Sequence, residues 1–297
     1  DSSTSRGLGD VYKRQVLKIL LVVVIVAGAA GISSGIGVMK GIIDSAPDIS
    51  KIDVTPTGYS TTVLAANGEE TATLVGQGAN RQYVTIDEIP LDLQHAFVAI
   101  EDERFYDHNG IDLHGIGRAF ISGLSKGRFS EGASTITQQL IKNNVLTSWT
   151  SETSFVEKLQ RKIQEQYLAL ELEKQVNDKD WILENYMNSV NLGANTLGVQ
   201  AASKKYFNKD VSELTLSEAS VIAGITQNPS GYNPITHPDK NAKRREKVLN
   251  NMKDQGYISK AQYDEAMADD VYSRIAEYNT TGSGCVNTCL LYTSPSP

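Results

Sequence analysis

The stretch Ala96–Gly110 reads Ala-Phe-Val-Ala-Ile-Glu-Asp-Glu-Arg-Phe-Tyr-Asp-His-Asn-Gly. Its first five residues are apolar, and three acidic residues follow them directly. Such an apolar run is typical of a buried helix or strand. The element would carry Glu101 from the core to a surface or cleft, where a rigidly held carboxylate can act as a general base. On this stretch alone, solvated acids at the end of a helix are the simpler interpretation.

The length and charge of the chain limit the number of its domains and the class of protein to which it can belong. Its 297 residues can form one large domain or two small ones with an ample core. The formal net charge of −7 argues against a general nucleic-acid-binding protein, although local basic pockets remain compatible with it. The two cysteines, Cys285 and Cys289, lie at the C-terminal end, so they indicate no disulfide framework and no zinc site.

Both ends resemble translated sequencing-adapter sequence, at Asp10–Gln15 and Cys289–Pro297. Translated adapter sequence is foreign to the natural protein and carries no information about its fold. We therefore expect residues 1–15 to be non-native and residues 276–297 to be a truncated linker with an adapter-like tail. On this interpretation the natural protein is longer on both sides.

Residues 16–43 are expected to form a single transmembrane anchor. Ile19–Met39 contains no charged residue, and one bilayer crossing needs about 20 apolar residues. A cleaved signal peptide is the alternative, with Ala27–Ala30 as small residues near a cleavage site. The uncharged stretch continues well past Ala30, which favours an uncleaved span.

The remaining chain is expected to contain a short β-rich stalk and a helical domain. Residues 44–90 are polar, and Val63–Leu74 predicts two short strands around Asn67-Gly68, a typical hairpin pair. From Leu91 onward apolar residues recur at helical spacing. The expected helices are Phe155–Glu173, Trp181–Val190, Leu197–Tyr206, Leu216–Ile225 and Asn241–Asp254. The fold class is therefore mainly α, with one helical domain over residues 91–275.

A second informative stretch is Gly132-Ala-Ser-Thr-Ile-Thr-Gln-Gln-Leu-Ile-Lys-Asn143. Gly132 would allow close backbone approach, and Ser134 or Thr135 can cap a helix that begins there. Helical spacing brings four polar residues near one face: Thr135, Gln138, Gln139 and Lys142. Hydroxyls and amides can orient sugar hydroxyls or phosphate oxygens, and a lysine can neutralise phosphate. A polar, well-capped surface helix is the alternative.

A third stretch, Arg161-Lys-Ile-Gln-Glu165, lies inside a long expected helix. Glu165 follows Arg161 by four residues and Lys162 by three, so both bases can neighbour it. Taken alone, this spacing indicates an ordinary ion pair on a solvated face.

Together the three stretches resemble the motifs of the peptidoglycan glycosyltransferases, glycosyltransferase family 51. This is the polymerase domain of class A penicillin-binding proteins and of monofunctional glycosyltransferases. The matching residues of these three motifs are Glu101, Asp102, Phe105, His108, Gly110, Gly132, Ser134, Thr135, Thr137, Gln138, Gln139, Lys142, Asn143, Arg161, Lys162 and Glu165. Two further motifs match in order, within Ile182–Phe207 and Leu216–Pro234, so the agreement covers roughly Leu91–Ala268.

The resemblance implies a lysozyme-like helical domain that polymerises lipid II by inverting transfer, with release of undecaprenyl pyrophosphate. Glu101 would be the general base and Glu165 the second catalytic carboxylate. The implied substrate-binding residues are Arg118, Ser134, Thr135, Gln138, Gln139, Lys142, Asn143, Arg161 and Lys162. The implied structural residues are Asp102, Phe105, His108, Gly110 and Gly132. No organic cofactor is implied, but Glu165 could hold a divalent cation, Mg or Mn, or orient the adjacent bases.

The implied partners are lipid II, the growing glycan strand, the bacterial cytoplasmic membrane and the cell-wall synthesis machinery, and not nucleic acid. The catalytic domain would lie on the extracytoplasmic side of the cell membrane. Two alternatives remain: a lysozyme-like hydrolase or lytic transglycosylase, and a non-catalytic wall-binding protein. No Ser-x-x-Lys spacing of a transpeptidase occurs in this chain.

Overall fold

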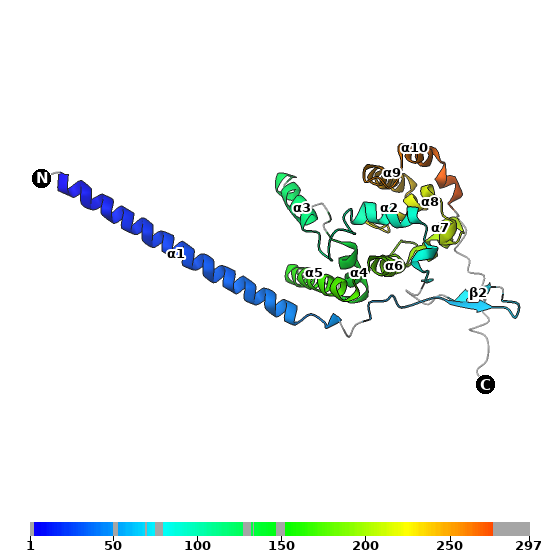
Figure 1. Ribbon diagram of the computed structural model, residues 1–297, viewed down its shortest axis with the longest axis horizontal. Coiled ribbons are helices and arrows are strands. Elements are labelled where there is room, and N and C mark those ends of the chain that lie inside the picture. Colours follow the sequence, from blue (N-terminus) through cyan, green and yellow to red (C-terminus); the bar gives the residue numbers. More distant parts are fainter. Residues whose placement is uncertain are drawn as a thin grey trace, which may run out of the picture. The chain divides into compact units, whose positions relative to one another are not determined.

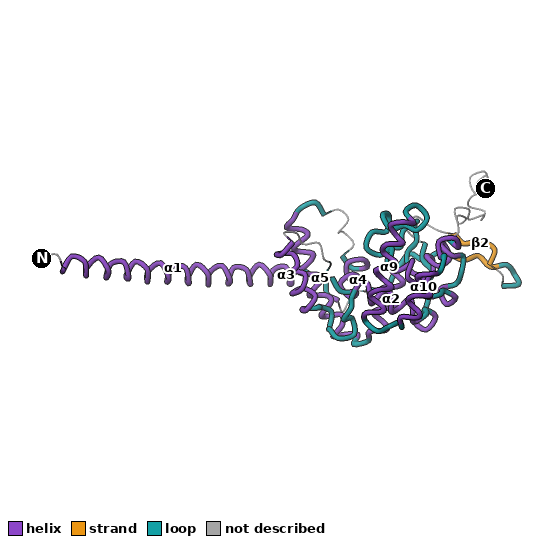
Figure 2. The backbone as a smooth tube through the Cα atoms, turned by 90° about the horizontal axis from the view of Figure 1, so that it is seen from above, coloured by secondary structure: helices purple, strands orange, loops and turns teal. Residues whose placement is uncertain are grey.

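The computed structural model describes residues 3–49, 53–68, 70–74, 80–126, 132, 134–146 and 152–275. These residues are mainly helical, which confirms the expected fold class (Figures 1 and 2). The chain forms two compact units, Asp1–Pro47 with Ser154–Gln164 and Asp48–Thr153 with Glu165–Pro297. The expected tail at 276–297 lies outside the described residues.

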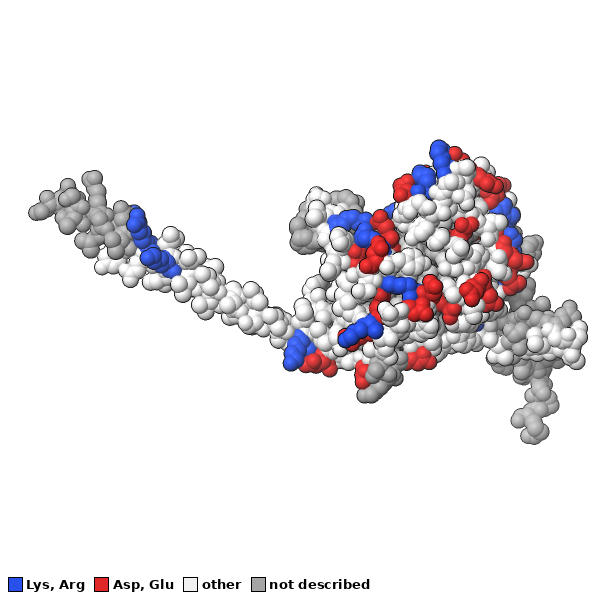
Figure 3. Space-filling view, in the orientation of Figure 1, with Lys and Arg blue, Asp and Glu red and all other residues white. Residues whose placement is uncertain are grey.

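The first unit contains α1 (Ser3–Asp44), which holds the expected membrane segment. By length and composition, Tyr12–Asp44 could cross a membrane. Figure 3 shows that Lys and Arg lie toward the ends of α1 and that its middle carries no charged side chain. The α1 C-terminal turn is tied to α5 (Phe155–Val176), because Gln164 Nε2 donates to Ile42 O at 3.3 Å and contacts Ser45 Oγ at 3.2 Å. The carbonyls of a last helical turn need such outside donors.

The predicted hairpin is confirmed as β1 (Thr61–Leu64) and β2 (Glu70–Leu74), an antiparallel pair in which Thr61 is opposite Leu74. Gly68 has a φ of +84°, which glycine adopts at little cost. The connection spans residues 65–69 and is longer than the two-residue turn that Asn67-Gly68 predicts.

The core of the second unit is built around α2 (Leu91–Glu101). Leu93, Ala96, Phe97 and Val98 are all fully buried, as expected for a helix that is apolar on several faces. The apolar run Ala96–Ile100 is therefore part of a helix. It packs against α8 (Leu216–Ala223) and α9 (Pro238–Asp254).

Helix α9 also fixes the C-terminal end of α2. The Ala99 carbonyl has no partner within its own helix because the chain turns at Asp102. It accepts hydrogen bonds from Asn251 Nδ2 of α9 at 2.9 Å and from Nε2 of Gln255, the C-cap residue of α9, at 3.1 Å. These two amides hold the turn of α2 that carries Glu101.

The other helices agree closely with the helical periodicity of the sequence. They are α3 (Leu113–Lys126), α4 (Ile136–Asn144), α6 (Lys179–Ser189), α7 (Val199–Phe207) and α10 (Lys260–Ala268), with short 3-10 turns η2 (Ile86–Glu88), η4 (Val211–Glu213) and η5 (Val271–Arg274). All five helices predicted downstream of Phe155 are confirmed. Helix α9 begins earlier than expected, with Pro238 in its first turn, where a missing N–H costs nothing.

The segment 80–90 packs on the helical unit, although its polar composition groups it with the stalk. Val84 and Ile89 are buried. Asn188 of α6 bonds both backbone groups of Val84, accepting from its N at 3.0 Å and donating to its O at 2.8 Å. Glu184 accepts from the Tyr83 hydroxyl and from Ile86 N. Residues of the expected fourth motif therefore attach this segment to α6.

Candidate active site

Glu101 is the last residue of α2 and is partly exposed. Its Oε2 accepts a hydrogen bond of 2.8 Å from Gln139 Nε2 of α4. Its Oε1 accepts one from the Thr226 hydroxyl, which follows α8. Both carboxylate oxygens are thus held by donors from separate elements, as a positioned base requires.

Tyr186 of α6 orients the Gln139 amide. Its hydroxyl donates to Gln139 Oε1 at 3.3 Å, so Gln139 Nε2 is turned toward Glu101. Burial, followed by the nearby Glu101 and Asp102, raises the pKa of Tyr186 well above its usual value. The phenol therefore stays neutral and can donate at any pH near neutrality.

Arg244 of α9 places a positive charge near Glu101. Burial lowers the pKa of this guanidinium, while Glu101 and Tyr232 oppose that effect. Its Nε is buried and has no hydrogen-bond partner among the described residues. Neither Thr226 nor Arg244 was identified from the sequence, because each reaches Glu101 only through the fold.

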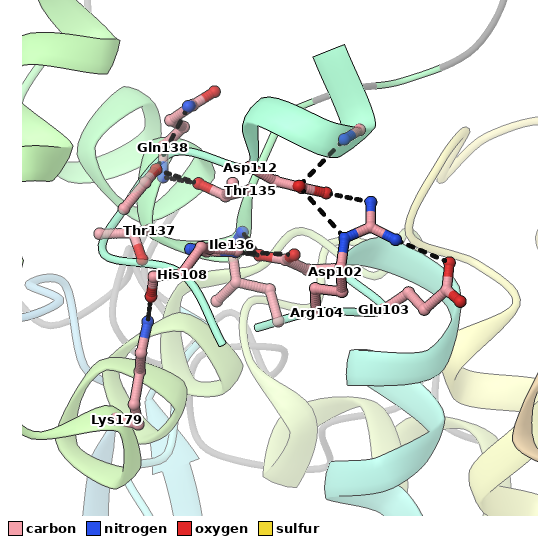
Figure 4. A network of polar contacts seen from close by, with 12 residues as sticks. Asp102, Glu103, Arg104, His108, Asp112, Thr135, Ile136, Thr137, Gln138 and Lys179 are labelled. Atoms are coloured by element: carbon pink, nitrogen blue, oxygen red, sulfur yellow. Dashed lines mark hydrogen bonds and ion pairs between the residues drawn. The ribbon is translucent and has the colours of Figure 1, made fainter. Parts of the chain in front are cut away.

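Asp102 joins the end of α2 to the start of α4 (Figure 4). Its Oδ2 accepts from the Ile136 amide at 2.9 Å, and His108 Nε2 lies 2.9 and 3.0 Å from its two oxygens. Asp102 is buried. It fixes the turn by hydrogen bonds, as its expected structural role requires.

The backbone carbonyl of Gly110 is the hydrogen-bond acceptor for two buried side chains, those of Thr135 and Gln138. The Gly110 carbonyl accepts from Thr135 Oγ1 at 2.7 Å and from Gln138 Nε2 at 3.3 Å. Thr135, one of the two predicted capping residues, is the N-cap of α4 and accepts from Gln138 N. Both residues are about 1% exposed, and their side chains hydrogen-bond the loop of residues 102–112. Their contact with a substrate stays a prediction.

Gly110 itself meets the structural role expected of it. Its φ is +86°, a conformation that L side chains rarely adopt. A Cβ at this position would lie 2.6 Å from the Ala169 carbonyl oxygen of α5. The loop thus crosses α5 at a point where only glycine fits.

Lys179 of α6 also holds this loop, although nothing in the sequence indicated it, and its side chain is partly exposed. Lys179 Nζ donates to His108 O at 2.6 Å and pairs with Glu173 at 2.5 Å (Figure 4). It also lies 4.6 Å from the centre of the buried Phe105 ring. Thr137 donates to the second Glu173 oxygen at 2.5 Å. Glu173 of α5 and Lys179 of α6 therefore hold three motif residues in place, namely Phe105, His108 and Thr137.

The predicted cationic residues are not all brought to Glu101. Arg118 lies on α3, beside a surface hollow of about 670 Å³, and pairs with the exposed Glu103 at 3.1 Å. Lys142, Asn143 and the preceding Ser134 are partly exposed on or near α4. Arg161 and Lys162 belong to the first compact unit, whereas Glu165 belongs to the second.

Glu165 is only about 1% exposed. Over the described ranges, no group of three or more His, Cys, Asp or Glu side chains is arranged to hold a metal ion. Mg²⁺ is commonly held by one or two carboxylates together with substrate phosphates. A divalent cation at Glu165 therefore stays a prediction.

Gly132 is exposed, and among the described residues no atom lies within 4 Å of where its Cβ would be. Residues 127–131 and 133 lie outside the described residues. The close backbone approach expected at this glycine stays a prediction.

Comparisons with known proteins agree with the motifs. The family model described as Transglycosylase matches residues 67–253. Penicillin-binding protein 1F of Bacillus subtilis (strain 168) is 46% identical over 200 residues, covering 67% of this chain and 27% of that protein. Penicillin-binding protein 1A/1B of the same organism is 38% identical over 262 residues, covering 88% of this chain and 27% of that protein.

The crystal structure of penicillin-binding protein 1A from Haemophilus influenzae is 25% identical, with a TM-score of 0.40, and is matched over 73% of this chain and 21% of that one. The chain spans about 27% of the length of the two curated relatives. Because the family model covers more than half of the chain, the chain belongs to the transglycosylase family, the peptidoglycan glycosyltransferases that its motifs resemble.

Proposed function

We propose that the chain polymerises lipid II into β-1,4-linked glycan strands with Glu101 as the general base. The observation that carries this proposal is the placement of the Glu101 carboxylate. It stands at the end of a buried helix, is partly exposed, and has one oxygen bonded by Gln139 and the other by Thr226. A base held this way needs little reorganisation before proton transfer.

In the proposed reaction, Glu101 takes the proton from the 4-hydroxyl of the acceptor sugar. The hydroxyl oxygen attacks the anomeric carbon of the donor, and the pyrophosphate leaves from the opposite face. Configuration therefore inverts, as in inverting glycoside hydrolysis, with a sugar hydroxyl in the place of water.

The leaving pyrophosphate needs positive charge more than it needs a proton donor. We assign this neutralisation to Lys142, Arg161 and Lys162, and the acceptor phosphate to Arg118. The partly exposed Lys142 supports the assignment, because it lies one helical turn beyond Gln138 and Gln139 on α4. Glu165 would orient the bases that precede it on α5 or hold a divalent cation beside the pyrophosphate.

We infer that α1 keeps the domain beside its lipid-linked substrate. The segment Tyr12–Asp44 could cross a bilayer, which would place the helical domain at the membrane surface. The proposed location is the extracytoplasmic side of the bacterial cell membrane.

Two incubations test the function. Purified chain in detergent is mixed with lipid II in one reaction and with finished glycan strands in another. The proposal predicts consumption of lipid II, release of undecaprenyl pyrophosphate and intact finished strands. Cleavage of the strands without consumption of lipid II would instead identify a hydrolase or lytic transglycosylase.

A further inference from the structure

We propose that Thr226 is a positioning residue for Glu101, whose hydroxyl bonds the carboxyl group in both of its protonation states. The inference rests on the proposed function, because it takes Glu101 as the base. It concerns a residue outside the substrate-binding and catalytic sets expected from the motifs.

Thr226 is placed by a tightly bonded turn. Helix α8 ends at Ala223, and Gly224 N and Ile225 N continue its hydrogen bonding to Ser220 O and Ile222 O at 3.1 Å each. Ile225 is fully buried, so this turn is anchored in the core. The Thr226 hydroxyl is therefore presented to Glu101 from a fixed backbone.

The hydroxyl has two acceptors and one hydrogen. Thr226 Oγ1 lies within hydrogen-bond distance of Glu101 Oε1, and it lies 3.0 Å from the Ala223 carbonyl. A threonine hydroxyl donates one bond and can accept others. While Glu101 is ionised, the hydrogen bonds the carboxylate, since hydrogen bonds to charged acceptors are the stronger ones.

The other carboxylate oxygen of Glu101, Oε2, faces a group that can only donate a hydrogen bond. Oε2 faces the Gln139 amide nitrogen at 2.8 Å, and that nitrogen donates only. The amide cannot turn over without losing the bond from the Tyr186 hydroxyl to its oxygen. A proton on Glu101 is therefore accommodated on Oε1, where it can be donated to Thr226 Oγ1.

Proton transfer then requires only a rotation at Thr226. The O–H bond of the acceptor sugar breaks and an O–H bond forms on Glu101 Oε1. The Thr226 hydrogen rotates from Glu101 to the Ala223 carbonyl, and no covalent bond of Thr226 changes. Both states of Glu101 remain hydrogen-bonded without movement of any heavy atom, which is the form of preorganisation that lowers reaction barriers.

The charged and titratable groups near Glu101 come from three directions. Arg244 approaches from α9 and the Tyr186 phenol from α6, and Asp102 follows Glu101 in the chain. On α8 the charged side chain is Glu218, which is engaged by Lys209 and Arg274. A change at Thr226 leaves all of these charges in place, so its effect on the pH profile reports on its own hydrogen bond.

The test compares Thr226→Val and Thr226→Ala with Thr226→Ser in the full chain, using lipid II as substrate and thermal melting to check folding. Removing one hydrogen bond to a charged group should lower kcat about tenfold to hundredfold in the first two variants. KM should stay near the parent value, and the acidic limb of the pH profile of kcat should move to higher pH. Thr226→Ser should restore most of kcat, and the exposed Thr236→Val should match the parent.

Parent-like kcat and pH profile in folded Thr226→Val or Thr226→Ala would overturn the proposal, and so would an equal loss in Thr226→Ser. If Glu101→Gln polymerises lipid II at the parent rate, the proposed function itself fails. If Glu101→Gln is inactive while Thr226→Val is parent-like, only the inference about Thr226 fails.

Discussion

The backbone amide of Ile136 donates a hydrogen bond of 2.9 Å to Oδ2 of Asp102. This contact joins the turn that follows α2 to the first residue of α4. Because Glu101 precedes Asp102 and Gln139 lies one turn into α4, the same contact sets how the Glu101 carboxylate meets the Gln139 amide. A structural carboxylate and the proposed base thus stand side by side in the chain.

Replacing Asp102 with Ala should lower the free energy of unfolding by roughly 2–3 kcal/mol, since it removes a helix-capping bond and leaves the buried His108 without its partner. Denaturant titration of the full chain measures this change. Asp102→Asn retains an oxygen that can accept from Ile136 N and should lose less. Equal stability of Asp102→Ala and the parent would contradict the capping role.

Gly110→Ala should destabilise the fold by at least about 2 kcal/mol, because a left-handed backbone is unfavourable for alanine and its Cβ would overlap the Ala169 carbonyl. The matched control is Gly117→Ala, in α3, where a Cβ meets no described atom within 4 Å. That variant should be neutral or gain about 0.5–1 kcal/mol. A Gly110→Ala melting temperature equal to that of the parent would refute the close approach to α5.

Gln139 and Tyr186 should act as one unit. Gln139→Leu should lower kcat about tenfold to hundredfold through loss of a bond to a charged oxygen, and Tyr186→Phe by about two- to tenfold through loss of a neutral one. In the Gln139→Leu background, Tyr186→Phe should have little further effect on kcat. Fully additive losses in the double variant would show that Tyr186 does not act through Gln139.

The end of the helical unit should be sensitive to acid. The hydrogen bond from Arg274, the largest influence, lowers the pKa of Asp269 from its usual 3.8 to about 2. A carboxylate with a lowered pKa contributes stability above its unfolded pKa and loses it as the pH falls toward 2. Arg274→Ala should therefore cost roughly 1–2 kcal/mol at pH 7, after allowance for solvent screening of this partly exposed pair.

The difference between Arg274→Ala and the parent should shrink below pH 4, and unfolding followed at several pH values measures it. Lys260→Ala is the control, because its exposed pair with Asp264 should contribute little at any pH. A stability difference that stays constant from pH 7 to pH 2.5 would exclude the Arg274–Asp269 pair as its source.

The sequence predicted those parts of the molecule that depend on local spacing. Helical periodicity located α5 to α9, and the hydroxyls before Ile136 predicted a cap of α4 at Ser134 or Thr135. Glu101 and Asp102 could be singled out because they end an apolar run. These features follow from residues within one or two turns of each other.

What the sequence could not predict depends on contacts between distant residues. Thr226 bonds Glu101 across 125 positions, and Arg244 and Lys179 meet their partners only when the helices pack. A threonine after α8 has no local property that distinguishes it from a turn residue.

The role of Glu101 as the base is tested most directly by the rate at which Glu101→Gln polymerises lipid II, measured as kcat in the full chain. The glutamine keeps the size and the hydrogen-bonding oxygen of the side chain but cannot accept the acceptor's proton. If Glu101 is the base, Glu101→Gln loses at least about a hundredfold in kcat at unchanged melting temperature, while Asp107→Asn, an exposed acid in the same loop, stays at the parent rate. Polymerisation by Glu101→Gln at the parent rate would contradict the assignment of Glu101 as the base.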